Sequence, residues 1–170
     1  GGDAMIRASA FQTVGGFDPS LIAGEEPELC VRLRKAGFRI WRLDVEMTWH
    51  DAALTRFGQW WRRSARAGHA AAEGAALHGS RPERHGVDRT RRALVWGVAL
   101  PLLALLGAFA TPWALLLFLA YPAQIIRLAS RDGWLQGLFL TMGKFAEAQG
   151  ALSYLWRRLI GAQARLIEYK

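Results

Sequence analysis

The chain has 170 residues with a formal net charge of +8, and 52% of its residues are hydrophobic. A single cysteine, Cys30, excludes a disulfide framework or a thiolate metal site within the chain, and it agrees with a reducing, cytoplasmic environment for residues 1–92. The basic charge comes without any nucleic-acid-binding motif, so no nucleic-acid partner is expected. The first residues are Gly-Gly-Asp, and we expect the chain to be a piece of a longer protein.

Residues 1–53 predict a soluble α/β segment. "DAMIRA" (3–8) predicts a short strand, and "SAFQTVGG" (9–16) predicts a helix that ends at two glycines. "FDPS" (17–20) predicts a turn, because proline fixes its own φ and aspartate can bond back to the backbone. "FRIWRL" (38–43) alternates apolar and basic residues, as a half-buried strand does.

A helix is predicted from about Glu25 to Ala36, and its first turn gathers Glu25, Glu26 and Glu28. Carboxylates in a first turn complement the positive end of the helix dipole, so they are ordinary there. The alternative is that one of a pair of carboxylates serves as a general base.

Residues 54–92 predict basic amphipathic helices and a loop. An aromatic cluster of Phe57, Trp60 and Trp61 is surrounded by arginines. Tryptophan with arginine is typical of a helix in the lipid headgroup region. The alternative is a helix packed on the soluble segment. His69 and Glu73 have helical i, i+4 spacing, but no third metal ligand is visible.

Residues 93–126 carry no charge, and basic residues flank them on both sides. A bilayer core needs roughly 20 helical residues for one crossing. Because lysine and arginine favour the cytoplasmic side, we predict a transmembrane hairpin that turns near Thr111 and Pro112. The alternative is one kinked span with the C-terminus outside. Residues 127–170 predict an interfacial segment and a cytoplasmic amphipathic helix.

An ordered series of motifs in the first section resembles a known family. After the glycine pair come "VGGFD" (14–18), "GEE" (24–26) and "LCVRLR" (29–34). This order is similar to the second half of the catalytic domain of membrane-bound, inverting family 2 glycosyltransferases. The resemblance implies an α/β fold for this part, the C-terminal half of a GT-A nucleotide-sugar transferase fold, followed by mostly α membrane helices.

The resemblance also implies roles for individual residues. Glu26 stands where the family places its catalytic base, although the family more often has aspartate there, and Glu25 is the fallback. Gly1, Gly2 and Asp3 would line the acceptor site, the alternative for Asp3 being a simple strand end. Glu28 is expected to be a helix-capping charge.

Contacts to the diphosphate or the acceptor are implied for Gln59, Arg62 and Arg63. "QWWRR" (59–63) is similar to a Gln-x-x-Arg-Trp motif of processive members without matching it, because Arg63 replaces the tryptophan. The alternative for these arginines is contact with headgroups. His50 is a possible metal or diphosphate contact, the alternative being a surface or capping histidine. A divalent metal, Mg or Mn, is implied by the resemblance alone.

The implied protein is a multi-pass inner-membrane enzyme whose catalytic part is cytoplasmic. It would transfer a sugar from a nucleotide-sugar donor to a hydroxyl acceptor, glycan or lipid-linked, and would contact membrane lipids. The donor site would lie mostly outside this chain, so the chain alone is expected to be inactive. The alternatives are a catalytically inactive, membrane-anchored interaction module and, less favoured, a small transport protein.

Overall fold

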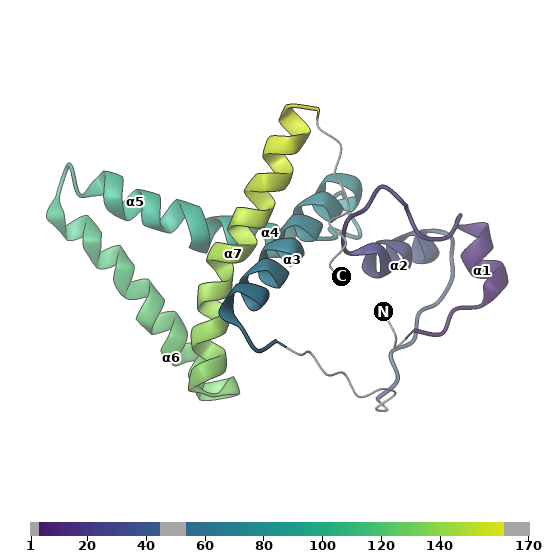
Figure 1. The fold of residues 1–170 in the computed structure, drawn as a ribbon, viewed down its shortest axis with the longest axis horizontal. Helices are drawn as coiled ribbons and strands as arrows, with labels where there is room; N and C mark the ends of the chain where they lie inside the picture. Colours follow the sequence, from purple (N-terminus) through teal and green to yellow (C-terminus); the bar gives the residue numbers. More distant parts are fainter. Residues whose placement is uncertain (1–3, 45–53, 162–170) are drawn as a thin grey trace.

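The computed structural model describes residues 4–44 and 54–161, and helices make up most of them (Figure 1). In chain order they are α1 (Ala8–Thr13), α2 (Glu25–Lys35), α3 (Phe57–His78), α4 (Val87–Leu94), the π-helix η1 (Val95–Ala99), α5 (Leu100–Gly107), the 3₁₀ helix η2 (Pro112–Leu119), α6 (Ala120–Asp132) and α7 (Trp134–Leu159).

The predicted α/β fold class is wrong for this part of the chain. Within residues 4–44 and 54–161 no segment forms a strand. The stretches predicted as strands, residues 4–7 and 38–43, lie outside any helix and have no ladder partner. A strand needs a neighbouring strand to satisfy its backbone N–H and C=O groups, so alternating sequence alone does not produce one. The described fold is therefore mostly helical.

Helices α1 and α2 share a small apolar core. Ala10 of α1 is buried against Leu29 and Leu33 of α2, and the partly buried residues Ile6, Phe11, Val14 and Phe38 surround them. Leu29 and Leu33 are one turn apart on the same helix face, which is how a short amphipathic helix buries its apolar side. This core positions the first turn of α2.

Helices α3 and α7 run side by side in the same direction (Figure 1). Two glycines let their backbones touch. A Cβ atom added at Gly150 would lie 1.8 Å from the carbonyl oxygen of Ala65, and one added at Gly68 would lie 2.0 Å from that of Glu147. Small residues at a helix crossing allow this close approach, so the pair forms the central support of the molecule.

Two apolar helical segments form a hairpin that projects away from α3 (Figure 1). The segments Val87–Gly107 and Pro112–Arg131 are long and apolar enough to cross a membrane, judged by length and composition alone. The π-helix η1 precedes Pro101, which lacks the N–H that would otherwise bond to the carbonyl of Gly97. The tip of the hairpin exposes Phe109 and Trp113.

Helix α7 lies across the open end of this hairpin, as Figure 1 shows. It contacts one arm where Gly97 lies against Lys144 and Ala148, and the other where Gly137 lies against the backbone of Ile125 and Ala129. The predicted interfacial segment that begins at Trp134 and the amphipathic helix predicted after it belong to one continuous helix, α7.

Candidate functional site

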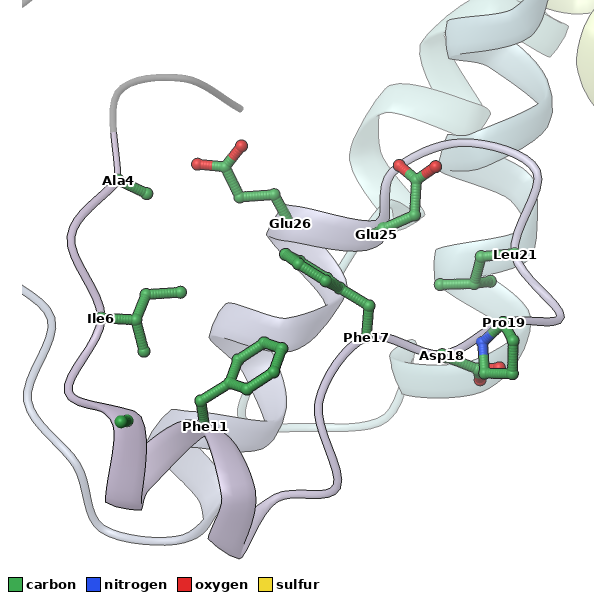
Figure 2. A pocket seen from close by; sticks show the side chains of 10 residues that line it. Ala4, Ile6, Phe11, Phe17, Asp18, Pro19, Leu21, Glu25 and Glu26 are labelled. Atoms are coloured by element: carbon green, nitrogen blue, oxygen red, sulfur yellow. The ribbon is translucent and has the colours of Figure 1, made fainter. Parts of the chain in front are cut away.

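A cavity of about 860 Å³ lies between α1, the loop after it and the start of α2 (Figure 2). Glu25 and Glu26 both line it from the first turn of α2. Gly24 precedes them with φ of 82°, a left-handed conformation that glycine adopts without a steric penalty. The turn at Gly24 therefore directs two consecutive carboxylates toward one cavity.

The remaining wall of the cavity is largely apolar. Phe11 and Phe17 meet edge to face with ring centroids 5.3 Å apart, and Ile6 and Leu21 line the cavity with them. In Figure 2, Glu26 extends toward Ala4, whereas Glu25 lies nearer Leu21. The site is therefore a chamber with carboxylates on one side and aromatic rings on another. The sequence analysis did not single out Phe11 or Phe17, although Phe17 belongs to the "VGGFD" motif.

Asp18 also lines the cavity, but its carboxylate holds a turn. Its Oδ1 accepts hydrogen bonds from the Ser20 backbone N–H at 2.9 Å and from the Ser20 hydroxyl at 2.7 Å. These bonds stabilise the charged form and lower the pKa of Asp18. Asp18 is thus committed to the geometry of the loop that leads into α2.

Glu28 does not act as the helix-capping charge that was predicted. Its side chain is buried and accepts hydrogen bonds from Arg32 at 2.7–2.9 Å and pairs with Nε2 of His78 at 2.8 Å. Arg32 in turn donates to the carbonyl of Val14. Burial by itself would raise the pKa of Glu28, but the hydrogen bonds from Arg32 and His78 outweigh it and the pKa is lowered. Glu28 therefore ties α2 to α3 and to the loop after α1, directly below the cavity-lining carboxylates.

The residues predicted to contact the diphosphate lie at the start of α3, and none of the three is among the residues lining this cavity. Oε1 of Gln59 accepts hydrogen bonds from the backbone N–H groups of Thr55 and Arg56 at 3.1 and 3.0 Å, so it caps the helix. Arg62 and Arg63 are exposed. Arg66, one turn further on, reaches the α2 side, where it donates to the carbonyl of Ile22.

The other predicted site residues lie outside the described residues. These are Gly1, Gly2 and Asp3, predicted for the acceptor site, and His50, predicted for the metal. Within residues 4–44 and 54–161, no group of three or more His, Cys, Asp or Glu side chains could hold a metal ion. The described residues thus offer no ligand set for the Mg or Mn ion that the family resemblance implies, and that ion stays a prediction.

His69 and Glu73, spaced as two metal ligands could be, form a buried pair instead. Nε2 of His69 lies 3.9 Å from Oε2 of Glu73, and neither atom has a hydrogen-bond partner. Burial, together with the charge of Arg157, lowers the pKa of His69, and burial, together with the charge of Asp18, raises the pKa of Glu73. Both shifts favour the neutral forms, as expected for polar groups enclosed between packed helices.

Comparison with known proteins finds similarity over short regions. The chain is 50% identical over 44 residues to "Succinoglycan biosynthesis protein ExoA" of Rhizobium meliloti, which covers 26% of this chain and 13% of that protein. It is 39% identical over 74 residues to "Pre-mycofactocin glycosyltransferase" of Mycobacterium tuberculosis, which covers 44% of this chain and 16% of that protein. The matched regions therefore span about one-seventh of these curated relatives.

No protein-family profile matches the chain, and no solved structure matches it. The names of these partial relatives describe a protein of succinoglycan biosynthesis and a glycosyltransferase. A glycosyltransferase in general takes a nucleotide-sugar donor and an acceptor.

Proposed function

We propose that this chain is the C-terminal portion of a membrane-bound, inverting glycosyltransferase of the family 2 type. It would transfer a sugar from a nucleotide-sugar to a hydroxyl acceptor during synthesis of an exopolysaccharide, an envelope glycan or a glycolipid. One observation carries the proposal: consecutive carboxylates, Glu25 and Glu26, line one cavity in a chain that is partly similar to a named glycosyltransferase.

Glu26 is the proposed catalytic base. A direct displacement at the anomeric carbon forms one C–O bond to the acceptor and breaks the C–O bond to the donor phosphate. The acceptor hydroxyl loses its proton to the Glu26 carboxylate, and the nucleoside diphosphate leaves with the electron pair of the broken bond. A carboxylate performs this role when it lies within about 3 Å of the hydroxyl. Glu25 would hold the acceptor through a hydrogen bond.

The walls of the cavity suit an acceptor that presents both hydroxyl groups and apolar faces. Phe11 and Phe17 offer ring surfaces, and sugar C–H faces or aliphatic groups can pack on them. The two carboxylates opposite them accept hydrogen bonds from hydroxyl groups. Acceptor binding in this chamber is thus consistent with the proposed role of Glu26.

The donor site is assigned to parts of a longer protein that these residues do not include. The relatives are several times longer than the regions matched here, and the described residues contain no cluster of metal ligands. A divalent metal in such enzymes supplies electrostatic stabilisation of the leaving diphosphate. No step assigned to Glu25 or Glu26 depends on it.

The hairpin is the proposed membrane anchor. Few side chains of its two apolar segments are buried within the chain, which suits contact with lipid chains. Basic residues gather at its open end and aromatic residues at its tip, and the basic ones are Arg91, Arg92, Arg127 and Arg131. Because basic residues favour the cytoplasmic side, the open end and the cavity are assigned to the cytoplasmic face of the inner membrane.

The decisive test replaces single carboxylates in the full-length protein and measures sugar transfer and donor binding separately. Glu26→Gln is expected to lower kcat by about 10²–10⁴-fold while donor affinity stays unchanged, because only proton removal is lost. Glu83→Gln, at a partly exposed carboxylate on the loop after α3 and outside the cavity, is the matched control and should keep full activity.

Wild-type turnover in Glu26→Gln would end the assignment of Glu26. If Glu25→Gln abolished transfer instead, the base would be Glu25. Absence of turnover in the wild-type protein with every nucleotide-sugar tried, together with no nucleotide-binding half encoded upstream, would favour the inactive interaction module.

A further inference from the structure

The last turns of α7 expose a continuous apolar face. It consists of Leu152, Leu155, Trp156 and Leu159, which we call the α7 stripe, and their exposed fractions are 45%, 39%, 64% and 81%. The spacing i, i+3, i+4, i+7 places all four on one side of a helix. Exposing four large apolar side chains in one row to water is unfavourable, so this face calls for an apolar partner.

The α7 stripe continues the helix face that the hairpin covers earlier along α7. Gly137 and Ala148 on that face lie against α6 and η1, and Phe145 stacks on Tyr121 with ring centroids 5.4 Å apart. Steps of three and four residues lead from Gly137 through Thr141, Phe145 and Ala148 to Leu152, so the contact face and the stripe form one line. Beyond Ala148 the hairpin no longer covers this line.

The opposite face of α7 is already occupied. Gly150 packs against Ala65 of α3, and the ring of Tyr154 meets that of His69 edge to face at 5.3 Å. The stripe thus points to the side from which the hairpin projects, away from α3, α2 and the cavity. Figure 1 shows α7 running across the open end of the hairpin and beyond it.

Charge identifies the chemistry of the partner. From Ala148 to Gly161 the only charged residues are Arg157 and Arg158. Arg158 is exposed at the edge of the stripe, whereas Arg157 lies on the α3 side, where its charge acts on His69. A helix with exposed leucine and tryptophan on one face and arginine beside them is typical of helices that lie in the headgroup region of a bilayer containing anionic lipid. Tryptophan is enriched at that depth because its ring is apolar and its N–H is polar.

We infer that the α7 stripe lies in the headgroup and upper acyl region of the bilayer that holds the hairpin, with Arg158 contacting anionic lipid headgroups. This inference rests on the membrane anchoring in the proposed function. Helix α7 is then a flat interfacial helix on the cytoplasmic surface, with lipid beneath its C-terminal turns and α3 above it.

The experiment attaches a spin label to single cysteines in a Cys30→Ser background of the full-length protein, reconstituted in phosphatidylcholine vesicles with or without phosphatidylglycerol. Labels are placed at Leu155 and Leu159 in the stripe, at Leu103 in the hairpin as the lipid control and at Ala36 after α2 as the aqueous control. The measurement is the ratio of collision rates with oxygen, which enters lipid, and with a water-soluble nickel complex. The stripe labels should give a ratio several-fold above that of Ala36, and phosphatidylglycerol should raise it further.

Three results would overturn the placement of the stripe in lipid, and a fourth would overturn its contact with anionic headgroups. A ratio at Leu155 and Leu159 equal to that of Ala36, with Leu103 still in lipid, would leave the stripe in water although the hairpin is anchored. Immobile labels that neither reagent reaches would mean that protein, a second copy or another part of the chain, covers the stripe. An aqueous ratio at Leu103 itself would refute the assignment of the hairpin as a membrane anchor, and with it the lipid contact of the stripe. Loss of transfer activity alone would bear on the role of Glu26 and not on the stripe. Equal ratios with and without phosphatidylglycerol would refute the anionic-headgroup contact.

Discussion

Helix α3 is joined to α2 and to α7 by different physical means. Toward α2, contact is made by long polar side chains: His78 pairs with Glu28, Arg66 donates to the carbonyl of Ile22, and Arg34 pairs with Glu83 just beyond the end of α3. Toward α7, glycines bring the two backbones into direct contact. The joint between α2 and α3 depends on charge, and the joint between α7 and α3 depends on shape. The segment α1–α2, which carries the cavity, is therefore attached through the charge-dependent joint, whose long side chains can adjust more easily than two touching backbones.

The shape-dependent joint should show the largest effect of a single methyl group. Gly150→Ala would place a Cβ 1.8 Å from the Ala65 carbonyl oxygen, so the helices must separate. We expect a loss of about 3 kcal/mol in the free energy of unfolding. The measurement is denaturant unfolding of the full-length protein in detergent, followed by circular dichroism.

Gly58→Ala is the matched control, because a Cβ there meets nothing within 4 Å. It should stabilise the protein by about 0.5 kcal/mol through the better helix propensity of alanine. If the two variants were equally stable, the backbones of α3 and α7 would not touch as described.

The charge-dependent joint should respond to loss of one carboxylate. Glu28→Gln keeps the shape of the side chain but leaves Arg32 without its buried ion-pair partner. We expect a loss of about 2 kcal/mol, and faster amide hydrogen exchange in α2 than in α7. Glu83→Gln, at the exposed pair with Arg34, should change exchange in α2 far less. Equal exchange in α2 for wild type and Glu28→Gln would contradict the role assigned to Glu28.

The smallest expected effect is one of pH. Because the pKa of Glu28 is lowered in the folded protein, its contribution is fully present above the unfolded pKa of about 4.3 and is lost as the pH falls through the lower folded pKa. Lowering the pH should therefore speed hydrogen exchange in α2 of the wild-type protein, and this additional increase should be absent from Glu28→Gln. Hydrogen exchange in α2 measured from neutral pH down to below pH ~4 would show this difference, and identical pH profiles for both proteins would refute it.

The helices were predictable where the pattern is local. The predicted helix from about Glu25 to Ala36 closely matches α2, Glu25–Lys35, because its acidic first turn and the spacing of Leu29 and Leu33 are features of the segment itself. The predicted strand at residues 38–43 was wrong, because a strand depends on a neighbour that the segment does not encode. The close contact of Gly68 and Gly150 was also invisible in sequence, since small residues reveal packing only when their partner is known.

The cavity was predictable only in part. Placing Glu25 and Glu26 together needed only the motif, and both line the cavity; their catalytic roles stay predictions. The burial of Glu28 could not be foreseen, because its partner His78 comes from a helix 50 residues away. Phe11 and Phe17 form the wall only once α1 folds against α2.

In the proposed membrane arrangement, α7 contacts both the hairpin and α3, so the tilt of the hairpin would set the height of the cavity above the bilayer. A thinner or thicker membrane changes that tilt, and α7, moving as one rigid helix, would transmit the change to α3. Under the proposed function, bilayer thickness would then influence which acceptor ends can reach Glu25 and Glu26, without any direct contact between lipid and acceptor.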